Sequence, residues 1–375
     1  MTRVSWKVAI CVLLLAVFLI GAVLPACAEA LPQLPPFPEL EGLEVDASVL
    51  EALASNPPAE LEGLEVDAAV IEAMAVNPTP NPEGLDLIVK QTTNDDSSAS
   101  SHAGTVERVK YTTSDGSVKV ATVYLPYGYE DSDESYNALY LLHGSNGSIK
   151  SFLKPNETTA FQKELDQMIE SGELAPMIVV APTYYSPDGN EAILPLSEQV
   201  EIVSAFPLEL VTDIIPAVES QYRTYAKTVD MDGIRASRDH RAVGGFSLGG
   251  TAAWYVLLQE MQAFRYYLPM CEASWDDGEG GLTGILDGSL SAQVIHDAVI
   301  AQGYTGEDFF LYAATGTDDA AFHYLSQQMV AMLQYPDTFL PGENMTYCVS
   351  IGGEHSLTDA QAYVFRGLAK FWKDA

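Results

Sequence analysis

The stretch Arg241-Ala242-Val243-Gly244-Gly245-Phe246-Ser247-Leu248-Gly249-Gly250 decides the fold of this 375-residue chain. Its first six residues form a short, mostly apolar run that predicts a buried strand, and the apolar residues from Leu248 onward predict a helix. A serine at such a strand-to-helix turn, within the pattern G-x-S-x-G, projects its hydroxyl above the end of the sheet. The alternative is a glycine-rich turn whose serine takes no part in chemistry. Ser247 is therefore a nucleophile only if the chain also supplies its partners.

Outward from this turn, short apolar runs alternate with helical patterns. Two runs, 106–112 and 118–125, predict an antiparallel pair. Further strands are predicted at 138–142, 177–181, 266–271, 309–314 and 347–351, and helices at 155–171, 196–222 and 248–261. Short strands that alternate with helices predict a mostly parallel central sheet with helices on both faces. Together with the serine turn, this order predicts an α/β protein with the α/β-hydrolase fold.

A serine hydroxyl is a weak nucleophile without a base. His355 follows the last predicted strand, and its place after Ser247 agrees with the Ser…Asp…His chain order of this fold. The carboxylate that orients the imidazole should lie between the two, after a strand. Asp319 is our first choice and Asp318 the alternative, because the two adjacent residues follow the same predicted strand. Either side chain could instead cap the next helix.

Acyl transfer also needs donors for the negative charge that develops on the substrate oxygen. We expect these donors to be the backbone N–H groups of Leu248, directly after the nucleophile, and of Ser145, in the glycine turn after strand 138–142. His143 lies in the same turn. It is either a structural residue or one that contacts the substrate.

The first 28 residues have the order of an export signal. Arg3 and Lys7 precede a long uncharged apolar run, and the small residues Ala26-Cys27-Ala28 follow it, as at a signal-peptidase cleavage site. We expect cleavage after Ala28. One alternative is a retained membrane anchor. Another is a lipoprotein signal that ends before Cys27, which would then carry a lipid, so the protein is expected to be secreted or a cell-surface lipoprotein.

Residues 29–104 predict an irregular acidic spacer and linker. A unit that begins at Glu39 recurs at Glu60, a period of 21 residues, and two such units are too few for a self-supporting solenoid. From residue 29 to 105, fifteen acidic residues stand against one lysine, Lys90. A docking motif or a pro-segment folded over the enzyme is the alternative. The catalytic domain is expected at residues 105–375.

Composition limits the partners. The net charge of −34 argues against nucleic acid, because phosphate is bound by basic patches. A membrane is expected as a partner only through a lipid on Cys27. Cys271 and Cys348 are the cysteines of the expected catalytic domain, and we favour two buried thiols on neighbouring strands over a disulfide. The Cys and His residues do not have the spacing of metal ligands, so we expect neither a metal nor a cofactor.

Several blocks of this sequence together resemble the feruloyl-esterase-like branch of the esterase D group, which includes carbohydrate esterase family 1. They cover residues 105–375 and comprise 123–129, 141–144, 236–250, 267–270, 273–275, 314–319 and 352–355. The resemblance implies the triad Ser247, Asp319 and His355, and its Gly-Thr-x-Asp pattern favours Asp319 over Asp318. It also implies that Trp275 lines the substrate cleft, although ordinary core packing is the alternative.

The resemblance implies hydrolysis of feruloyl or acetyl esters on plant-wall polysaccharide through an acyl-enzyme. Two departures lie near the expected acyl pocket: Cys271-Glu272 replaces the usual Ser-Gly, and Ser356 follows His355. The acyl group therefore stays open. Two other functions also stay open. One is acyl transfer to an acceptor other than water, as in the mycolyltransferases of the same fold group. The other is a non-catalytic cell-surface binding protein on a hydrolase fold.

Overall fold

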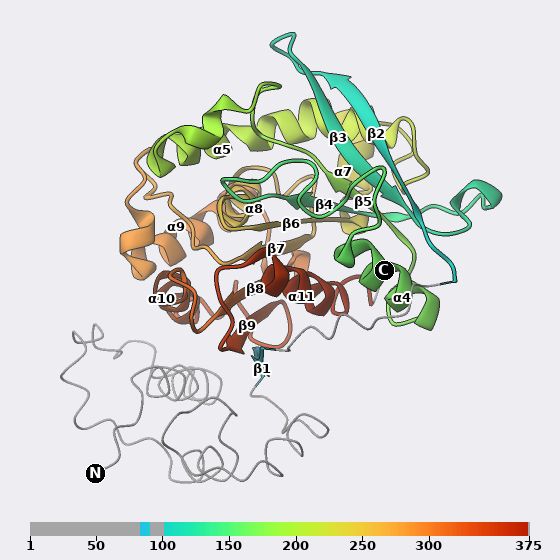
Figure 1. The fold of residues 1–375 in the computed structure, drawn as a ribbon. Helices are drawn as coiled ribbons and strands as arrows, with labels where there is room; N and C mark the ends of the chain where they lie inside the picture. Colours follow the sequence, from blue (N-terminus) through green and yellow to red (C-terminus); the bar gives the residue numbers. More distant parts are fainter. Residues whose placement is uncertain (1–82, 91–100, 374–375) are drawn as a thin grey trace, which may run out of the picture.

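The computed structural model describes residues 83–90 and 101–373. These ranges form a nine-stranded sheet with the order β1-β9-β8-β7-β6-β4-β5-β3-β2 (Figure 1). The strands are β1 Leu85–Val89, β2 Thr105–Thr112, β3 Val118–Leu125, β4 Asn137–Leu142, β5 Met177–Ala181, β6 Arg241–Phe246, β7 Tyr266–Met270, β8 Phe310–Gly316 and β9 Met345–Ile351. The predicted export signal, Cys27 and the two repeats lie outside the described residues.

The sheet is parallel from β1 through β9, β8, β7, β6 and β4 to β5, and antiparallel where β3 meets β5 and β2. This arrangement confirms the predicted α/β fold. Because the parallel strands run in one direction, the residues that follow β6, β7, β8 and β9 all reach the same carboxyl edge of the sheet. In open parallel sheets, ligands bind at this carboxyl edge.

Helices cover both faces of the sheet, and each face has its own apolar core. One core packs α5 (Leu196–Glu209), α8 (Leu248–Gln259), α9 (Gly288–Ala301) and α10 (Phe322–Met332) on the sheet, and the other packs α4 (Ala160–Ser171) and α11 (Leu357–Leu368). The shorter α-helices in the described part of the chain are α6 (Ile215–Glu219) and α7 (Met231–Ala236). Strand β5, which is fully apolar, and β4, which is apolar after Asn137, fit this burial on two sides.

Two predicted helices differ from the observed ones at their ends. The helix predicted from residue 155 begins at Ala160, because the Thr159 hydroxyl accepts a hydrogen bond from the backbone of Gln162 and caps the first turn. The helix predicted at 196–222 is α5, a π-helical turn at 210–214 and α6, and Pro207 lies inside α5. In the described part of the chain, no helix is both long and apolar enough to cross a membrane.

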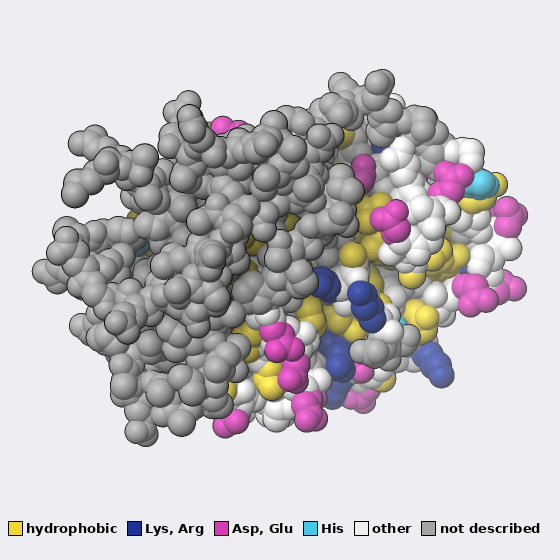
Figure 2. Space-filling view, turned by 90° about the horizontal axis from the view of Figure 1, so that it is seen from below, with side chains coloured by type: hydrophobic (Ala, Val, Ile, Leu, Met, Phe, Trp, Pro, Cys, Tyr) yellow, Lys and Arg dark blue, Asp and Glu magenta, His cyan; other side chains and the backbone are white. Residues whose placement is uncertain are grey.

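The main difference from the sequence analysis is β1. Its residues were placed in the spacer, but they pair in parallel with β9, with Leu85 beside Tyr347 and Val89 beside Ile351. Directly after β1, the Lys90 ammonium lies 2.6 Å from a carboxylate oxygen of Glu354. Seen from below, where β1 lies in Figure 1, basic side chains gather beside acidic ones (Figure 2). The predicted boundary at residue 105 therefore lies inside the sheet-forming part of the chain.

Candidate active site

Ser247 occupies a strained turn between β6 and α8. Its φ of 57° lies in the left-handed region that side-chain-bearing residues rarely adopt. The turn requires glycine at two positions, because a side chain there would clash with the backbone. A Cβ on Gly245 would lie 2.2 Å from the carbonyl oxygen of Gly249, and a Cβ on Gly249 would lie 2.5 Å from that of Leu142. The Ser247 N–H donates to the Met270 carbonyl at 2.9 Å, which ties the turn to β7. The sequence thus builds the strand–turn–helix setting that G-x-S-x-G predicts.

The turn brings Ser247 to His355, which lies 108 positions later in the chain. Nε2 of His355 lies 2.9 Å from the Ser247 hydroxyl oxygen, and Nδ1 lies 2.9 Å from Oδ1 of Asp319. His355 comes from the loop after β9 and Asp319 from the loop after β8, so the three side chains meet at the carboxyl edge of the sheet. The Phe246 ring lies 4.8 Å from the imidazole, centre to centre. A half-buried serine is thereby joined to a buried carboxylate through one ring.

The structure distinguishes the two adjacent aspartates. Asp319 is buried, and its Oδ1 accepts from the backbone N–H of Ala321 at 2.8 Å as well as from His355. Asp318 is exposed, its backbone N–H donates to Gly353, and the Thr317 hydroxyl lies near its carboxylate. Asp319, and not the alternative Asp318, therefore lies where a carboxylate can orient the imidazole.

Electrostatics make the imidazole of His355 more basic than a free one. The hydrogen bond to Asp319 raises the pKa of His355 above 6.5, burial opposes this rise, and the charges of Asp319 and Glu272 add to it. Glu272, directly after the end of β7, is itself unusual: burial raises the pKa of its carboxyl to about 7. Sequence analysis noted Glu272 only as a departure from the family pattern. Its position beside the expected acyl pocket is the signal from which Glu272 could have been predicted as a functional residue.

The glycine turn after β4 lies against the nucleophile. A Cβ on Gly144 would lie 3.3 Å from Cβ of Ser247. In the same turn, the Ser145 hydroxyl donates to Gln199 and its carbonyl accepts from the Tyr185 hydroxyl, both at 2.6 Å. Within the described residues, the backbone N–H groups of Ser145 and Leu248 donate to no other group. Both predicted oxyanion donors are therefore held in position with their hydrogens unused.

His143 and Trp275 differ in what they can contact. The ring of His143 is buried, with Nδ1 2.8 Å from the Gly144 carbonyl and Nε2 2.8 Å from the Thr183 hydroxyl, and burial lowers its pKa to about 4. These contacts favour the structural role over substrate contact. Trp275 is half-buried in the segment after β7 and packs against the apolar core that also contains α8, while its Nε1 has no hydrogen-bond partner within the described residues.

One group of potential metal ligands includes the same residues. Atoms of Cys271, Asp319 and His355 lie within 4.8 Å of one another. The Asp319–His355 hydrogen bond already joins two of the three, so a metal bound there would have to displace it. Cys271 and Cys348 are free, buried thiols, and they lie on either side of β8 rather than on adjacent strands. The arrangement is thus that of a hydrogen-bonded triad with a thiol beside it.

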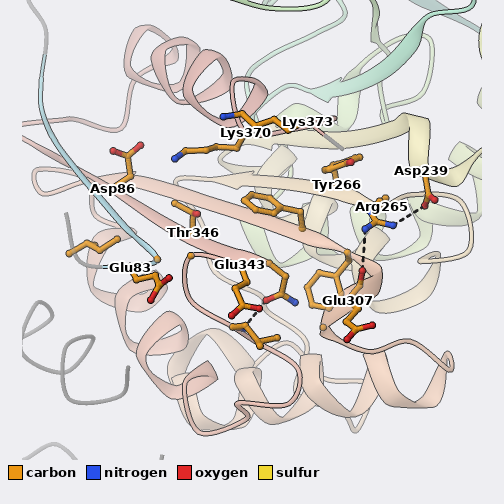
Figure 3. A pocket seen from close by; sticks show the side chains of 18 of the residues that line it. Glu83, Asp86, Asp239, Arg265, Tyr266, Glu307, Glu343, Thr346, Lys370 and Lys373 are labelled. Atoms are coloured by element: carbon orange, nitrogen blue, oxygen red, sulfur yellow. Dashed lines mark hydrogen bonds and ion pairs between the residues drawn. The ribbon is translucent and has the colours of Figure 1, made fainter. Parts of the chain in front are cut away.

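A cleft lies at the opposite, amino-terminal edge of the sheet. It encloses about 930 Å³ between the starts of β1, β9, β8 and β7 and the end of the chain at Lys370 and Lys373. Figure 3 shows Arg265 there, in contact with Asp239 and with the backbone of Glu307. Ser247, Asp319 and His355 do not line it. The chemistry of the triad therefore belongs to the other edge.

Comparisons with known proteins point to esterases. Residues 113–281 match the family model described as "Putative esterase". The chain is 32% identical over 277 residues to endo-1,4-beta-xylanase Y of Acetivibrio thermocellus, covering 72% of this chain and 23% of the relative. It is 26% identical over 169 residues to an endo-1,4-beta-xylanase/feruloyl esterase of Xylanibacter ruminicola, covering 44% of this chain and 21% of the relative. The chain thus spans less than a quarter of these curated relatives.

A solved structure matches over nearly its full length. It is a serine-to-alanine mutant of the feruloyl esterase module from Clostridium thermocellum, complexed with sinapinate. It shares 29% sequence identity with this chain and a TM-score of 0.66, and the match covers 77% of this chain and 95% of that one. The part of the long relatives that this chain resembles is therefore of the size of one such module.

Proposed function

Because this chain belongs to the feruloyl-esterase-like family of carboxylic ester hydrolases, we propose that Ser247, His355 and Asp319 form its catalytic triad. The observation that carries the proposal is the continuous hydrogen-bonded chain from the Ser247 hydroxyl through both ring nitrogens of His355 to Asp319, with two contacts of 2.9 Å. Hydroxyl, imidazole and carboxylate in this order activate a serine for attack on a carbonyl.

In the acylation step, each of these contacts has one role. The Ser247 oxygen forms a bond to the ester carbonyl carbon while Nε2 of His355 takes the hydroxyl proton. The carbonyl oxygen becomes an oxyanion that the backbone N–H groups of Leu248 and Ser145 stabilise. The bond to the alcohol then breaks, and the alcohol leaves with the proton from Nε2. Asp319 keeps Nδ1 protonated throughout and stabilises the imidazolium.

Deacylation repeats the sequence with water. Nε2 takes a proton from water, the hydroxide oxygen bonds to the acyl carbon, and the bond to Ser247 breaks as the proton passes to the serine oxygen. The carboxylic acid is released and the enzyme returns to its starting state. The raised pKa of His355 suits a base that must hold a proton between these steps.

We propose a feruloyl- or acetyl-esterified polysaccharide as the substrate. The Clostridium thermocellum module was solved with sinapinate, and the Xylanibacter ruminicola relative is named a xylanase/feruloyl esterase. A net charge of −34 suits a neutral polymer better than an anionic one. The residues before 29 support export, with release after Ala28 or a lipid on Cys27 as the two routes.

The first test is a panel of feruloyl, acetyl and short-chain acyl esters, free and on xylan, assayed with the full chain. We expect hydrolysis, with kcat reduced at least about 10⁴-fold in Ser247→Ala and in His355→Ala. The exposed Ser220→Ala is the matched control and should keep wild-type activity. Fluorophosphonate should label wild type and the control but not Ser247→Ala.

The outcomes separate the alternatives. Labelling of Ser247 with acyl transfer between glycans but no hydrolysis of any ester would favour an acyltransferase. Absence of labelling and of turnover in the folded wild type would favour a binding protein. Hydrolysis that persists in His355→Ala would refute the base assignment.

A further inference from the structure

Only one of the two oxygens of the Asp319 carboxylate has hydrogen-bond partners. Oδ1 accepts two hydrogen bonds, from His355 and from the backbone of Ala321. Oδ2 is fully buried, and within the described residues it has no hydrogen-bond partner. The Asp319 side chain is 0% exposed, so bulk water cannot take that place. A buried carboxylate oxygen without a donor is costly, and its neighbour should be a group that can supply a hydrogen.

Cys271 is that neighbour. Its sulfur and a carboxylate oxygen of Asp319 lie within 4.8 Å of each other, and the side chain is 0% exposed. The residue follows β7, the strand between the one that leads to Ser247 and β8, which leads to Asp319. Its N–H donates to the Ala314 carbonyl on β8 at 2.8 Å. Cys271 therefore reaches the Asp319 carboxylate from the middle strand.

The backbone of Cys271 is strained. Its φ is 58°, in the region that favours glycine, and besides Ser247 and Trp372 it is the non-glycine residue with positive φ among the described residues. Strain of this kind persists where the surrounding structure requires it, often at functional sites. Glycine would relieve the strain at Cys271 but would remove the side chain behind Asp319.

The thiol is in the state that a donor needs. Burial and the charge of Asp319 raise the pKa of Cys271 well above 9, so the sulfur keeps its hydrogen. A thiol offers one weak donor and one weak acceptor. The hydroxyl of Thr315 is also buried and has no hydrogen-bond partner in the described chain, and it opposes the rise in the pKa of the Cys271 thiol. The hydroxyl can give its hydrogen to the sulfur while the thiol gives its own to Asp319.

We propose that the Cys271 thiol donates to Oδ2 of Asp319 and thereby holds the carboxylate in line with Nδ1 of His355. Cys271 is then a positioning residue, since it acts on the reaction only through Asp319. The inference rests on the proposed triad. It adds a fourth side chain, which comes from the strand between the two that supply Ser247 and Asp319.

The test compares Cys271→Ala and Cys271→Ser in the full chain. Both keep a Cβ, so both keep the same backbone strain, but only serine keeps a donor. We expect kcat to fall about three- to tenfold in Cys271→Ala with KM nearly unchanged, and to stay within about twofold of wild type in Cys271→Ser. Cys348→Ala is the matched control, because that thiol is equally buried but lies on β9, away from Asp319. Its kcat should equal that of wild type.

A second readout does not depend on turnover. The S–H stretching band of Cys271, taken as the infrared difference between wild type and Cys271→Ser, should lie at lower frequency than that of a thiol in apolar surroundings. Active-site counting with fluorophosphonate corrects kcat for any misfolded fraction. Equal kcat in Cys271→Ala and Cys348→Ala, equal losses in Cys271→Ala and Cys271→Ser, or an unshifted band would each overturn the proposal. Activity that survives in Ser247→Ala would instead overturn the triad on which it rests.

Discussion

At the scale of the single residue, the state of His355 controls the proposed chemistry. The hydrogen bond to Asp319 is the largest cause of its raised pKa, and the charge of Glu272 contributes in the same direction. The imidazole must be neutral to accept a proton, so kcat/KM should rise with pH through its pKa. Because burial raises the pKa of Glu272 to about 7, the negative charge of this carboxyl beside the imidazole itself changes with pH in the neutral range.

Glu272→Gln should therefore move the acid limb of kcat/KM to lower pH. The substitution removes a negative charge that favours the imidazolium, so the pKa of His355 falls and the neutral base persists in more acidic buffer. The measurement is kcat/KM for a neutral aryl ester from about pH 5 to about pH 9.

Glu354→Gln is the matched control for this prediction. That carboxylate is next to His355 in sequence, but its side chain is 64% exposed and paired with Lys90, so water screens its charge. The limb should stay in place. A Glu272→Gln profile that superimposes on that of wild type would show that this carboxyl does not act on the imidazole.

At the scale of the element, β6 is anchored at the end remote from Ser247. Arg241, its first residue, forms a two-pronged pair with Glu219 at the end of α6, at 2.6 and 2.8 Å, and both side chains are 1% exposed. Glu219 also accepts from the hydroxyls of Tyr140 on β4 and Thr224. One buried pair thus joins two neighbouring strands to the helix that covers them.

Glu219→Gln should lower the free energy of unfolding by about 3–5 kcal/mol, because it leaves the Arg241 guanidinium buried without a counter-charge. Urea denaturation measures the change. The folded fraction should keep wild-type kcat, since the pair lies at the amino end of β6. Asp232→Asn is the control: it breaks an arginine pair with Arg235 whose side chains are 94% and 52% exposed, and should cost less than about 1 kcal/mol. Equal losses would mean that burial does not set the strength of the pair.

At the scale of the whole molecule, the segment before the expected catalytic domain completes the sheet. Leu85 is buried at its edge, the Tyr312 hydroxyl donates to Asp86 at 2.6 Å, and β1 covers the edge of β9. Lys90 then reaches Glu354 and, at 3.4 Å, Asp359. These contacts join the end of the acidic spacer to the loop that carries His355.

A chain of residues 105–375 should therefore be less stable than one of residues 83–375, by at least about 2 kcal/mol for the loss of the buried Leu85 and the β1 pairing. Its kcat should also fall, because the loop of His355 loses its support. Thermal unfolding and ester hydrolysis measure the two effects. Lys90→Ala in the longer chain separates them, since it removes the ion pairs and keeps β1. Identical stability of the two chains would show that β1 is dispensable.

The agreement between sequence and structure was best where the signal was local. The strand before Ser247 and its turn were predicted to the residue, because a short apolar run and the glycines that the turn requires lie side by side in the chain. β1 was missed because Leu85–Val89 is a short apolar strand in an acidic context, and only its pairing with β9 makes it part of the sheet. Lys90, the one lysine of the acidic segment, pairs with Glu354, which lies 264 positions later in the chain, and no neighbouring residue indicates this partner.

The sequence by itself determined the alternation of strands and helices, the turn at Ser247 and the order of three residues along the chain, because each of these follows from neighbouring side chains. Tertiary structure alone decided that His143 is buried and that Cys271 lies close to Asp319, and it brought Asp319, which the family pattern already favoured, against His355. The physical reason is that hydrogen bonds and burial depend on distances between the ends of different strands. Those distances exist only once the sheet has brought the strand ends to one edge.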